Sequence, residues 1–271
     1  MIQAAQEGIS AGSLAEVGAV FAATSLALAP LAILVVRRLF PGRNVFFARW
    51  GFSHVAIVAA LAAVLLLALA FLDPAVAKLS ASTRTLVELA LRTAVLLGCC
   101  AAVAIFARRL DPSGLRSLGL WHGRNLRAAV AGLAGYGIVL PGILGLGLLW
   151  PWVLQAIGAD ARPDLLLERL RALDPGERSV AILLAVLVAP LLEEVLFRAF
   201  LQPLLVQNLS DRLGVVVTSF VFAALHGTAA IVPIFALSLL LGAIMLRTQR
   251  LFAVWAVHAT HNALVFLLLY A

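Results

Sequence analysis

Two adjacent carboxylates, Glu193 and Glu194, lie inside one of the most apolar stretches of the chain, and Arg198 follows four residues after the second. The surrounding residues Ala181–Phe200 have the length and hydropathy of a membrane helix, where ionised groups are costly and usually functional. Residues i and i+4 share a helix face, so Glu194 and Arg198 are expected to pair. Glu193 diverges from that face by about 100° and is the carboxylate available for chemistry. The competing interpretation is that both glutamates only pair with arginines.

Two histidines and an amide in later apolar segments complete the polar set. His226 ends one segment, and Phe222 lies one turn earlier on the same face, where its ring is expected to wall the imidazole. His258 and Asn262 are also four residues apart and share one face of the last helix. His261 projects to a different side and is left out of the predicted site. Taken alone, the His258–Asn262 pair also suits interhelical hydrogen bonding.

These residue types predict a hydrolytic site. A carboxylate and an imidazole that share one water molecule can activate it by general-base catalysis. An imidazole and an amide can donate hydrogen bonds to the oxyanion that forms when water attacks a carbonyl carbon. Glu193 with His226 fits the first role, and His258 with Asn262 fits the second. The reaction that uses both is hydrolysis of a peptide or amide bond.

The composition predicts the fold class. Hydrophobic residues make up 63% of the chain and charged residues only 12%, whereas a soluble domain would carry about 25% charged residues. We therefore predict an all-α, polytopic membrane protein. We expect one transmembrane domain over residues 1–271, with about eight helices that enclose an intramembrane polar cavity. Segments of bilayer-spanning length are predicted at Ala15–Val36, Phe52–Leu72, Leu86–Phe106, Ala128–Trp150, Val180–Phe200, Val215–His226 with its flanks, Ala230–Leu246 and Phe252–Tyr270.

Arginine placement predicts the topology. The formal net charge is +7, and most arginines fall in alternate connections, which the positive-inside rule assigns to the cytoplasm. Both termini then lie outside, and anionic lipid headgroups rather than nucleic acid are the expected contacts of the basic surface. The arginines concerned are Arg37, Arg38, Arg43 and Arg49, then Arg108, Arg109, Arg116, Arg124 and Arg127, then Arg212, and finally Arg247 and Arg250.

This topology also predicts the depth of the polar groups. A rise of about 1.5 Å per residue places Glu193 and His226 each about 22 Å from the cytoplasmic side. The same arithmetic places His258 about 11 Å and Asn262 about 17 Å deep. Topology thus brings the four groups toward one layer of the membrane.

One connection is expected to contain an amphipathic helix. Residues 162–173 place leucines at helical spacing with charged side chains opposite, as an interfacial helix would. We expect this helix to rest on the lipid headgroups, and partial cover of the active site is the alternative.

The three motifs together resemble a known family. Glu193–Arg198 matches EExxxR, Phe222–His226 matches FxxxH, and His258–Asn262 matches HxxxN. In this order within apolar helices they resemble the CPBP intramembrane proteases, the family of the CAAX prenyl endopeptidase, also called Abi. The resemblance covers about Val180 to Phe266, which is the expected catalytic half. It implies a membrane-embedded helical fold with a cavity in the bilayer, with the four polar groups in the roles given above.

The resemblance leaves the cofactor open. The family has been called metalloprotease-like, and a metal-free glutamate mechanism is also proposed for its members. The chain lacks HExxH, whose two histidines make the familiar zinc site. Zn²⁺ could still be held by Glu193, His226 and His258 from separate helices, although we favour a reaction that requires no cofactor.

The sequence therefore predicts an intramembrane endopeptidase of a bacterial inner membrane, acting on a peptide or a membrane-associated protein. One alternative is a non-proteolytic membrane scaffold or bacteriocin-immunity protein that keeps the protease fold. A second is a proton-coupled transporter, because glutamate and histidine in membrane helices also form proton relays.

Overall fold

The computed structural model describes residues 16–24, 27, 34, 38, 48–120, 125–159, 169–170 and 173–270. Within these residues the chain is helical and contains six helices that are long and apolar enough to cross a membrane. The prediction of an all-α, polytopic membrane protein is therefore confirmed.

The predicted number of eight spans is not confirmed. Half of the first segment, Ala15–Val36, lies outside the described residues, and residues 16–24 form the one described stretch of helix there. The sixth segment corresponds to a helix of 14 residues, Asp211–Ala224. At about 1.5 Å per residue this helix spans about 21 Å, which is shorter than the roughly 30 Å of bilayer hydrocarbon.

The described helices follow one another in a simple order. The long helix at Pro175–Asn208 is continuous, but two π-helical stretches divide it into three α-helical parts. The elements are α3 (Phe52–Val76), α4 (Ala81–Leu110), the short 3₁₀ helix η1 (Gly114–Leu118), α5 (Asn125–Ala156), α7 (Pro175–Leu183), η2 (Leu184–Val188), α8 (Ala189–Glu194), η3 (Val195–Leu201), α9 (Gln202–Asn208), α10 (Asp211–Ala224), α11 (Ile231–Thr248) and α12 (Leu251–Tyr270).

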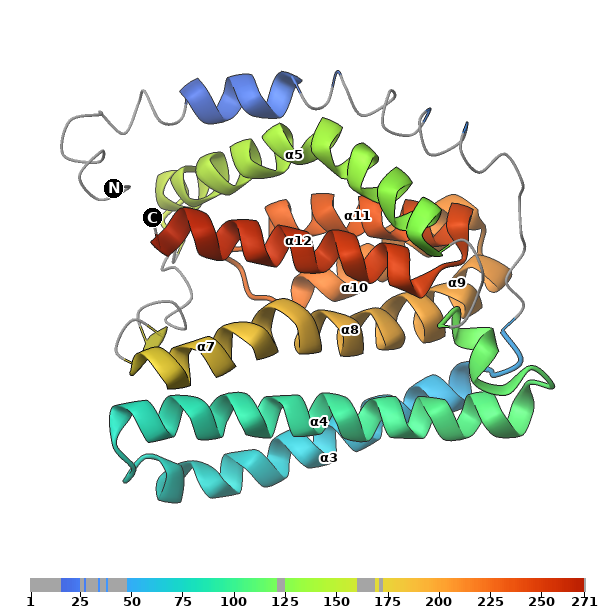
Figure 1. Ribbon diagram of the computed structural model, residues 1–271, viewed down its shortest axis with the longest axis horizontal. Coiled ribbons are helices and arrows are strands. Elements are labelled where there is room, and N and C mark those ends of the chain that lie inside the picture. Colours follow the sequence, from blue (N-terminus) through green and yellow to red (C-terminus); the bar gives the residue numbers. More distant parts are fainter. Residues whose placement is uncertain are drawn as a thin grey trace.

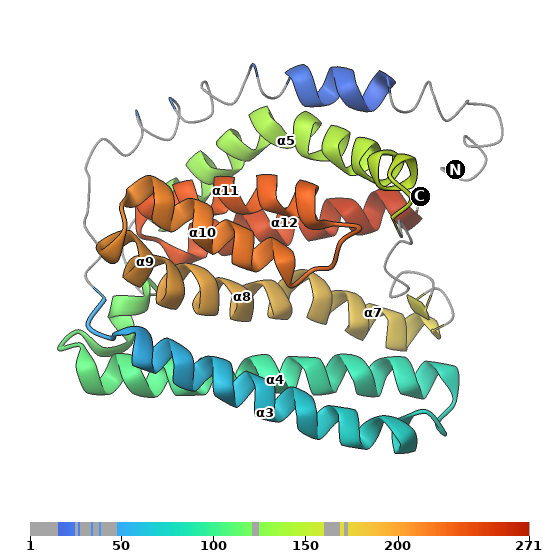
Figure 2. The same cartoon turned by 180° about the vertical axis from the view of Figure 1, so that it is seen from behind.

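The helices stack in layers (Figure 1 and Figure 2). The α3–α4 hairpin forms one side, the long helix α7–α9 lies next to it, and α10, α11 and α12 follow, with α5 beyond them. Helix α12 packs against both α5 and α8, and α10 packs against α9 and α11. The motif-bearing helices are therefore in the interior of the bundle.

Side-chain caps fix where two of these helices begin. The Ser80 hydroxyl accepts a hydrogen bond from the backbone N–H of Thr83 at 3.3 Å, at the start of α4. Ser210 accepts one from the backbone N–H of Leu213 at 3.2 Å, at the start of α10. Such caps satisfy backbone donors that the first helical turn leaves free, and Ser210 thereby sets the tight connection from α9 to α10.

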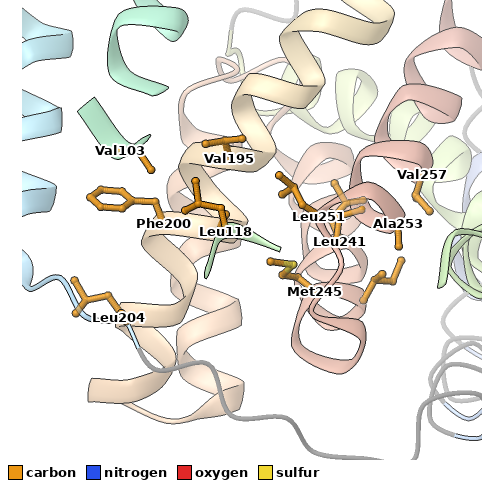
Figure 3. Close-up of a cluster of buried hydrophobic side chains, with 14 of the residues drawn as sticks. Val103, Leu118, Val195, Phe200, Leu204, Leu241, Met245, Leu251, Ala253 and Val257 are labelled. Carbon is orange, nitrogen blue, oxygen red and sulfur yellow. The ribbon is translucent and has the colours of Figure 1, made fainter. Parts of the chain in front are cut away.

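A buried apolar cluster joins the end of the long helix to its neighbours (Figure 3). Val195, Phe200 and Leu204 of the long helix contact side chains from α4, η1, α11 and α12. The labelled members on those elements are Val103, Leu118, Leu241, Met245, Leu251, Ala253 and Val257. This cluster fixes the rotation of the long helix, and with it the direction in which Glu193 and Glu194 point.

Three described residues of the segment predicted as a headgroup-bound helix contact the protein. Of residues 162–173, only Arg169, Leu170 and Leu173 are among the described residues. Both leucines are buried and pack with Ala181 against Leu86, Leu89 and Phe266, while Nη1 of Arg169 lies 2.6 Å from Oε2 of Glu88. These two leucines therefore face α4, α7 and α12 rather than the headgroups, and the other residues of the predicted helix lie outside the described residues.

Glycines allow the closest helix contacts. A Cβ on Gly214 of α10 would lie 2.5 Å from the backbone nitrogen of Val206 in α9, and a Cβ on Gly242 of α11 would lie 2.8 Å from Cγ1 of Val215. The backbones of α9 and α10 therefore approach too closely for a side chain between them.

Gly214→Ala is expected to destabilise the protein by about 1–3 kcal/mol, because the new methyl group would push against the backbone of α9. Thermal unfolding of the purified protein in detergent measures this loss. Gly137→Ala is the matched control, since a Cβ on this α5 glycine would contact nothing within 4 Å. An unfolding temperature equal in the two variants would contradict the described contact.

Candidate active site

The two glutamates sit on α8, a short α-helical part between the π-helical stretches η2 and η3. A π stretch shifts the backbone hydrogen bonds from i+4 to i+5, and such stretches are frequent at functional sites. The shift leaves carbonyl groups in need of other donors. Two side chains of α12 and one from the bend before α3 supply them: Asn262 Nδ2 to the Ala185 oxygen at 3.0 Å, Trp255 Nε1 to the Leu187 oxygen at 2.9 Å, and Trp50 Nε1 to the Phe200 oxygen at 2.9 Å.

Glu194 is fully buried and bridges two cationic or ionisable partners. Its Oε2 lies 3.2 Å from Nε of Arg198, which is the pair predicted from the spacing of four residues. Its Oε1 accepts a hydrogen bond from Nδ1 of His258 at 2.7 Å. A buried carboxylate needs such compensation, so Glu194 is committed to holding Arg198 and His258 in place.

Arg198 is also fully buried. Its Nη2 donates a hydrogen bond to Oγ of Ser238 at 2.8 Å, and its Cζ lies 4.3 Å from the ring centroid of Phe222. The cation–π contact and the hydrogen bond add to the ion pair with Glu194. Arg198 thereby joins the long helix to α11 and α10.

His258 lies between the two glutamates. Its Nδ1 is committed to Glu194, and its Nε2 lies 3.8 Å from Oε2 of Glu193. The side chain of Glu193 is 21% exposed, whereas that of Glu194 is 0% exposed. The two neighbouring carboxylates therefore divide as the sequence predicts: one is sequestered in an ion pair and the other remains accessible.

His226 lies in the turn between α10 and α11, followed by Gly227 at a φ of 82°. Its Nδ1 donates to the backbone oxygen of Phe222 at 2.7 Å, which leaves Nε2 as a hydrogen-bond acceptor in the neutral imidazole. The Phe222 ring lies 4.5 Å from the His226 ring and 5.8 Å from the His258 ring, centroid to centroid. The phenylalanine thus walls His226, as expected, and also His258.

The turn that holds His226 also indicates access to water. Residues 224–228 are exposed, and the length of α10, about 21 Å, ends it within the thickness of a bilayer. Non-helical backbone at membrane depth occurs only where it is buried in protein or lines a water-filled space. One carbonyl of this turn, that of Thr228, accepts a hydrogen bond from Nε1 of Trp150 at 2.7 Å. Because His226 is exposed in this turn, we expect water to reach its imidazole.

The structure brings two of the four predicted residues into direct contact. His258 contacts Glu193 and Glu194, and the ion-pair contact of Glu193 among the described residues is to His258. The predicted roles of Glu193 and His226 need no direct contact between them, because both bind one water molecule. Asn262 uses one N–H of its amide for the Ala185 oxygen, and its second N–H is not needed for that bond. His261, as expected, faces elsewhere: its Nδ1 lies 3.0 Å from the hydroxyl oxygen of Tyr136 in α5.

Sequence reasoning missed one residue and one contact of this site. Ser238 of α11 and the hydrogen bond between Glu194 and His258 both join helices that are far apart in the sequence. A serine within an apolar helix was the available signal for Ser238. Nothing in the sequence pattern indicates which glutamate His258 contacts.

The side chains of the site are not arranged to bind a metal ion. Among the described residues, no three His, Cys, Asp or Glu side chains lie close enough together to hold an ion. Nδ1 of His258 is committed to Glu194, so only Nε2 remains as a ligand. In this arrangement Glu193, His226 and His258 do not form a zinc site, and no chemical step is assigned to a metal here.

Comparison with known proteins agrees with the site. Residues 175–264 match the family model described as type II CAAX prenyl endopeptidase Rce1-like. This part of the chain is similar to that family. The match runs from the start of α7 into α12 and includes all three motifs. The similarity supports, at the level of the family, an intramembrane protease. No curated protein and no solved structure gave a significant match to the chain.

Arg198→Met is expected to lower the free energy of unfolding by about 3–5 kcal/mol, because it removes one partner of a buried ion pair. The double variant Glu194→Gln/Arg198→Met should recover part of this loss, since no uncompensated charge is left. Denaturant-induced unfolding in detergent measures both.

The partly exposed pair Arg84–Glu88 on α4 is the matched control. It has the same spacing of four residues, with Nε and Oε1 2.7 Å apart, but solvent screens it. Arg84→Met should therefore cost much less stability than Arg198→Met. Equal losses at the two positions would show that burial does not determine the strength of the Arg198 pair.

Proposed function

We propose that the protein is an intramembrane endopeptidase in which Glu193 and His226 activate water and His258 and Asn262 stabilise the oxyanion. The observation that carries the proposal is the position of His258. Buried Glu194 holds its Nδ1 at 2.7 Å, and its Nε2 faces accessible Glu193 at 3.8 Å. Both groups lie beside the water-exposed turn of His226.

The two carboxylates support different roles. Glu194 is fully buried and committed to Arg198 and His258, so it is not free to accept a proton from water. Glu193 is accessible and has only the longer contact to His258. Glu193 takes a proton from the attacking water, and Nε2 of His226 accepts a second hydrogen bond from that water. The oxygen of the water then attacks the carbonyl carbon of the scissile bond. The C–N bond breaks when the tetrahedral intermediate collapses, and the leaving amine takes the proton held by Glu193.

His258 and Asn262 act on the carbonyl oxygen. When Nδ1 of His258 donates to Glu194, Nε2 can donate to the oxyanion only if the ring carries both protons. The negative charges of Glu193 and Glu194 offset the charge of this imidazolium. The N–H of Asn262 that is not bonded to Ala185 is the second donor. Preorganised donors of this kind stabilise charge that develops in the transition state.

The proposed setting is a bacterial inner membrane, with a peptide or a membrane-associated protein as substrate. The connections from α4 to α5, from α9 to α10 and from α11 to α12 lie at one end of the molecule (Figure 1). These connections contain or adjoin Arg108, Arg109, Arg116, Arg212, Arg247 and Arg250. This supports a cytoplasmic location for that end and termini on the other side. The basic residues there suit lipid headgroups, and the proposal includes no nucleic acid partner and no required cofactor.

Glu193→Gln and His226→Ala are each expected to reduce cleavage of a peptide library by at least about 100-fold, because each removes a group that activates water. The assay uses purified protein in detergent, with and without a chelator. Glu177→Gln at the start of α7 is the matched control and should cleave like the wild type.

The chelator distinguishes the two catalytic interpretations. Unchanged turnover with chelator supports the metal-free reaction. Activity that is lost with chelator and restored by Zn²⁺ would instead assign Glu193, His226 and His258 to a metal. No cleavage above background by the wild type would contradict the proposed protease and favour the scaffold.

Asn262→Ala is expected to lower kcat by about 100- to 1000-fold while KM changes little, because an oxyanion donor acts in the transition state. Steady-state cleavage kinetics measure both constants. Thr260→Ala is the control on the same helix, since the Thr260 hydroxyl donates only to the Ala256 oxygen of α12 at 2.7 Å. A lowered unfolding temperature with unchanged kcat would show that Asn262 only stabilises the structure through its contact with Ala185 and does not act on the oxyanion.

A further inference from the structure

The Arg198 guanidinium is short of hydrogen-bond acceptors. It is fully buried, and a guanidinium carries five N–H donors and keeps its charge in proteins. Within the part of the chain that the structure describes, Nε and Nη1 have no hydrogen-bond partner. Oε2 of Glu194 lies 3.2 Å from Nε, close enough for an ion pair, but it also has no hydrogen bond of good geometry. The hydrogen bond that orients this guanidinium is therefore the one from Nη2 to Oγ of Ser238 at 2.8 Å.

Ser238 is placed to hold this orientation rigidly. It is fully buried on α11, where the serine offers an acceptor from a short side chain with little freedom. One turn further along the same two helices, Nε2 of Gln202 donates to the backbone oxygen of Gly242 at 3.0 Å. The contacts of residues 198 and 202 with residues 238 and 242 fix the register between the long helix and α11.

We propose that Ser238 is a positioning residue for His258, acting through Arg198 and Glu194. This inference rests on the proposed function, in which His258 stabilises the oxyanion. The connection runs from Ser238 Oγ to Arg198 Nη2 at 2.8 Å, from Arg198 Nε to Glu194 Oε2 at 3.2 Å, and from Glu194 Oε1 to His258 Nδ1 at 2.7 Å. It links α11 to α12 through the long helix.

Loss of the serine oxygen has a defined structural consequence. The guanidinium would then rotate to direct its Nη groups at Glu194, the carboxylate that already lies 3.2 Å from its Nε. The carboxylate would turn toward Arg198 and weaken its bond to Nδ1 of His258. The imidazole of His258 would then rotate, and its Nε2 would no longer point toward Glu193. Outer partners of a reacting histidine fix its orientation in this way in metal sites as well.

The kinetic test compares Ser238→Ala with Ser238→Thr, which keeps the acceptor oxygen. We expect kcat of Ser238→Ala to fall by about 10- to 100-fold, the range found for outer partners of a reacting histidine, with little change in KM. Ser238→Thr should keep kcat within about threefold of the wild type, since it retains the hydrogen bond. In a Glu194→Gln background, Ser238→Ala should cause no further loss, because residues of one network are not additive.

Gln202→Met is the matched control. It removes the neighbouring hydrogen bond between the same two helices without touching Arg198 or Glu194. We expect it to lower the unfolding temperature and to leave kcat unchanged. If Gln202→Met lowered kcat as much as Ser238→Ala, the effect would belong to helix packing, and the proposed role of Ser238 would be wrong.

A second readout does not depend on catalysis. The chain has 5 histidines, so nuclear magnetic resonance of protein labelled with ¹⁵N at histidine can follow His258, whose signal is assigned by its absence in His258→Gln. We expect the Nδ1 resonance to move in Ser238→Ala and to stay in place in Ser238→Thr and Gln202→Met. A protein that cleaves no peptide would overturn the proposed protease, while this resonance would still report on the connection from Ser238.

Two outcomes would overturn the role of Ser238. The first is an Nδ1 resonance of His258 in Ser238→Ala that is the same as in the wild type, whatever happens to kcat. The second is a Ser238→Thr variant that loses activity and shifts the resonance as much as Ser238→Ala does, because the hydroxyl oxygen would then not be the determinant.

Discussion

A charge that cannot be neutralised must be compensated when it lies inside a membrane protein, and Arg198 imposes this requirement here. Its guanidinium stays ionised and is fully buried, so Glu194, Ser238 and Phe222 must surround it. These partners come from the long helix, α11 and α10, and Glu194 extends the contact to His258 on α12. One buried cation thus fixes four helices relative to one another and orients an imidazole beside accessible Glu193.

The π-helical stretches complete this arrangement at the backbone level. They leave carbonyl groups that accept hydrogen bonds from Asn262, Trp255 and Trp50, so the irregular helix is stabilised only within the assembled bundle. The two α12 donors lie seven residues apart and lock that helix along η2. One N–H of Asn262 therefore holds α12 against η2, and we assign the other to the oxyanion. The same side chain thus contributes to the stability of α12 and to catalysis.

We expect water to reach the site because α10, at about 21 Å, is shorter than the bilayer hydrocarbon. Its end places the exposed turn with His226 at membrane depth, where polar backbone requires hydration. The packing of α10 is in turn set by Gly214 against Val206 and by Gly242 against Val215. Small residues in the helix contacts therefore decide where the water-accessible turn lies relative to His258 and Glu193.

The sequence by itself determined the features that depend on local spacing. Apolar segments fixed six of the helices, the spacing of four residues fixed the pair of Glu194 and Arg198, and the three motifs located the polar groups. Only the tertiary structure decided which groups meet across helices: His258 with Glu194, Arg198 with Ser238, and Leu170 and Leu173 with the protein instead of the headgroups. Helical periodicity specifies a face of one helix, whereas the distance and rotation between helices come from packing at glycines, π stretches and the buried charge. Hydropathy predicted a full span for the α10 segment. In the structure the helix ends at Ala224, before the turn at Gly227.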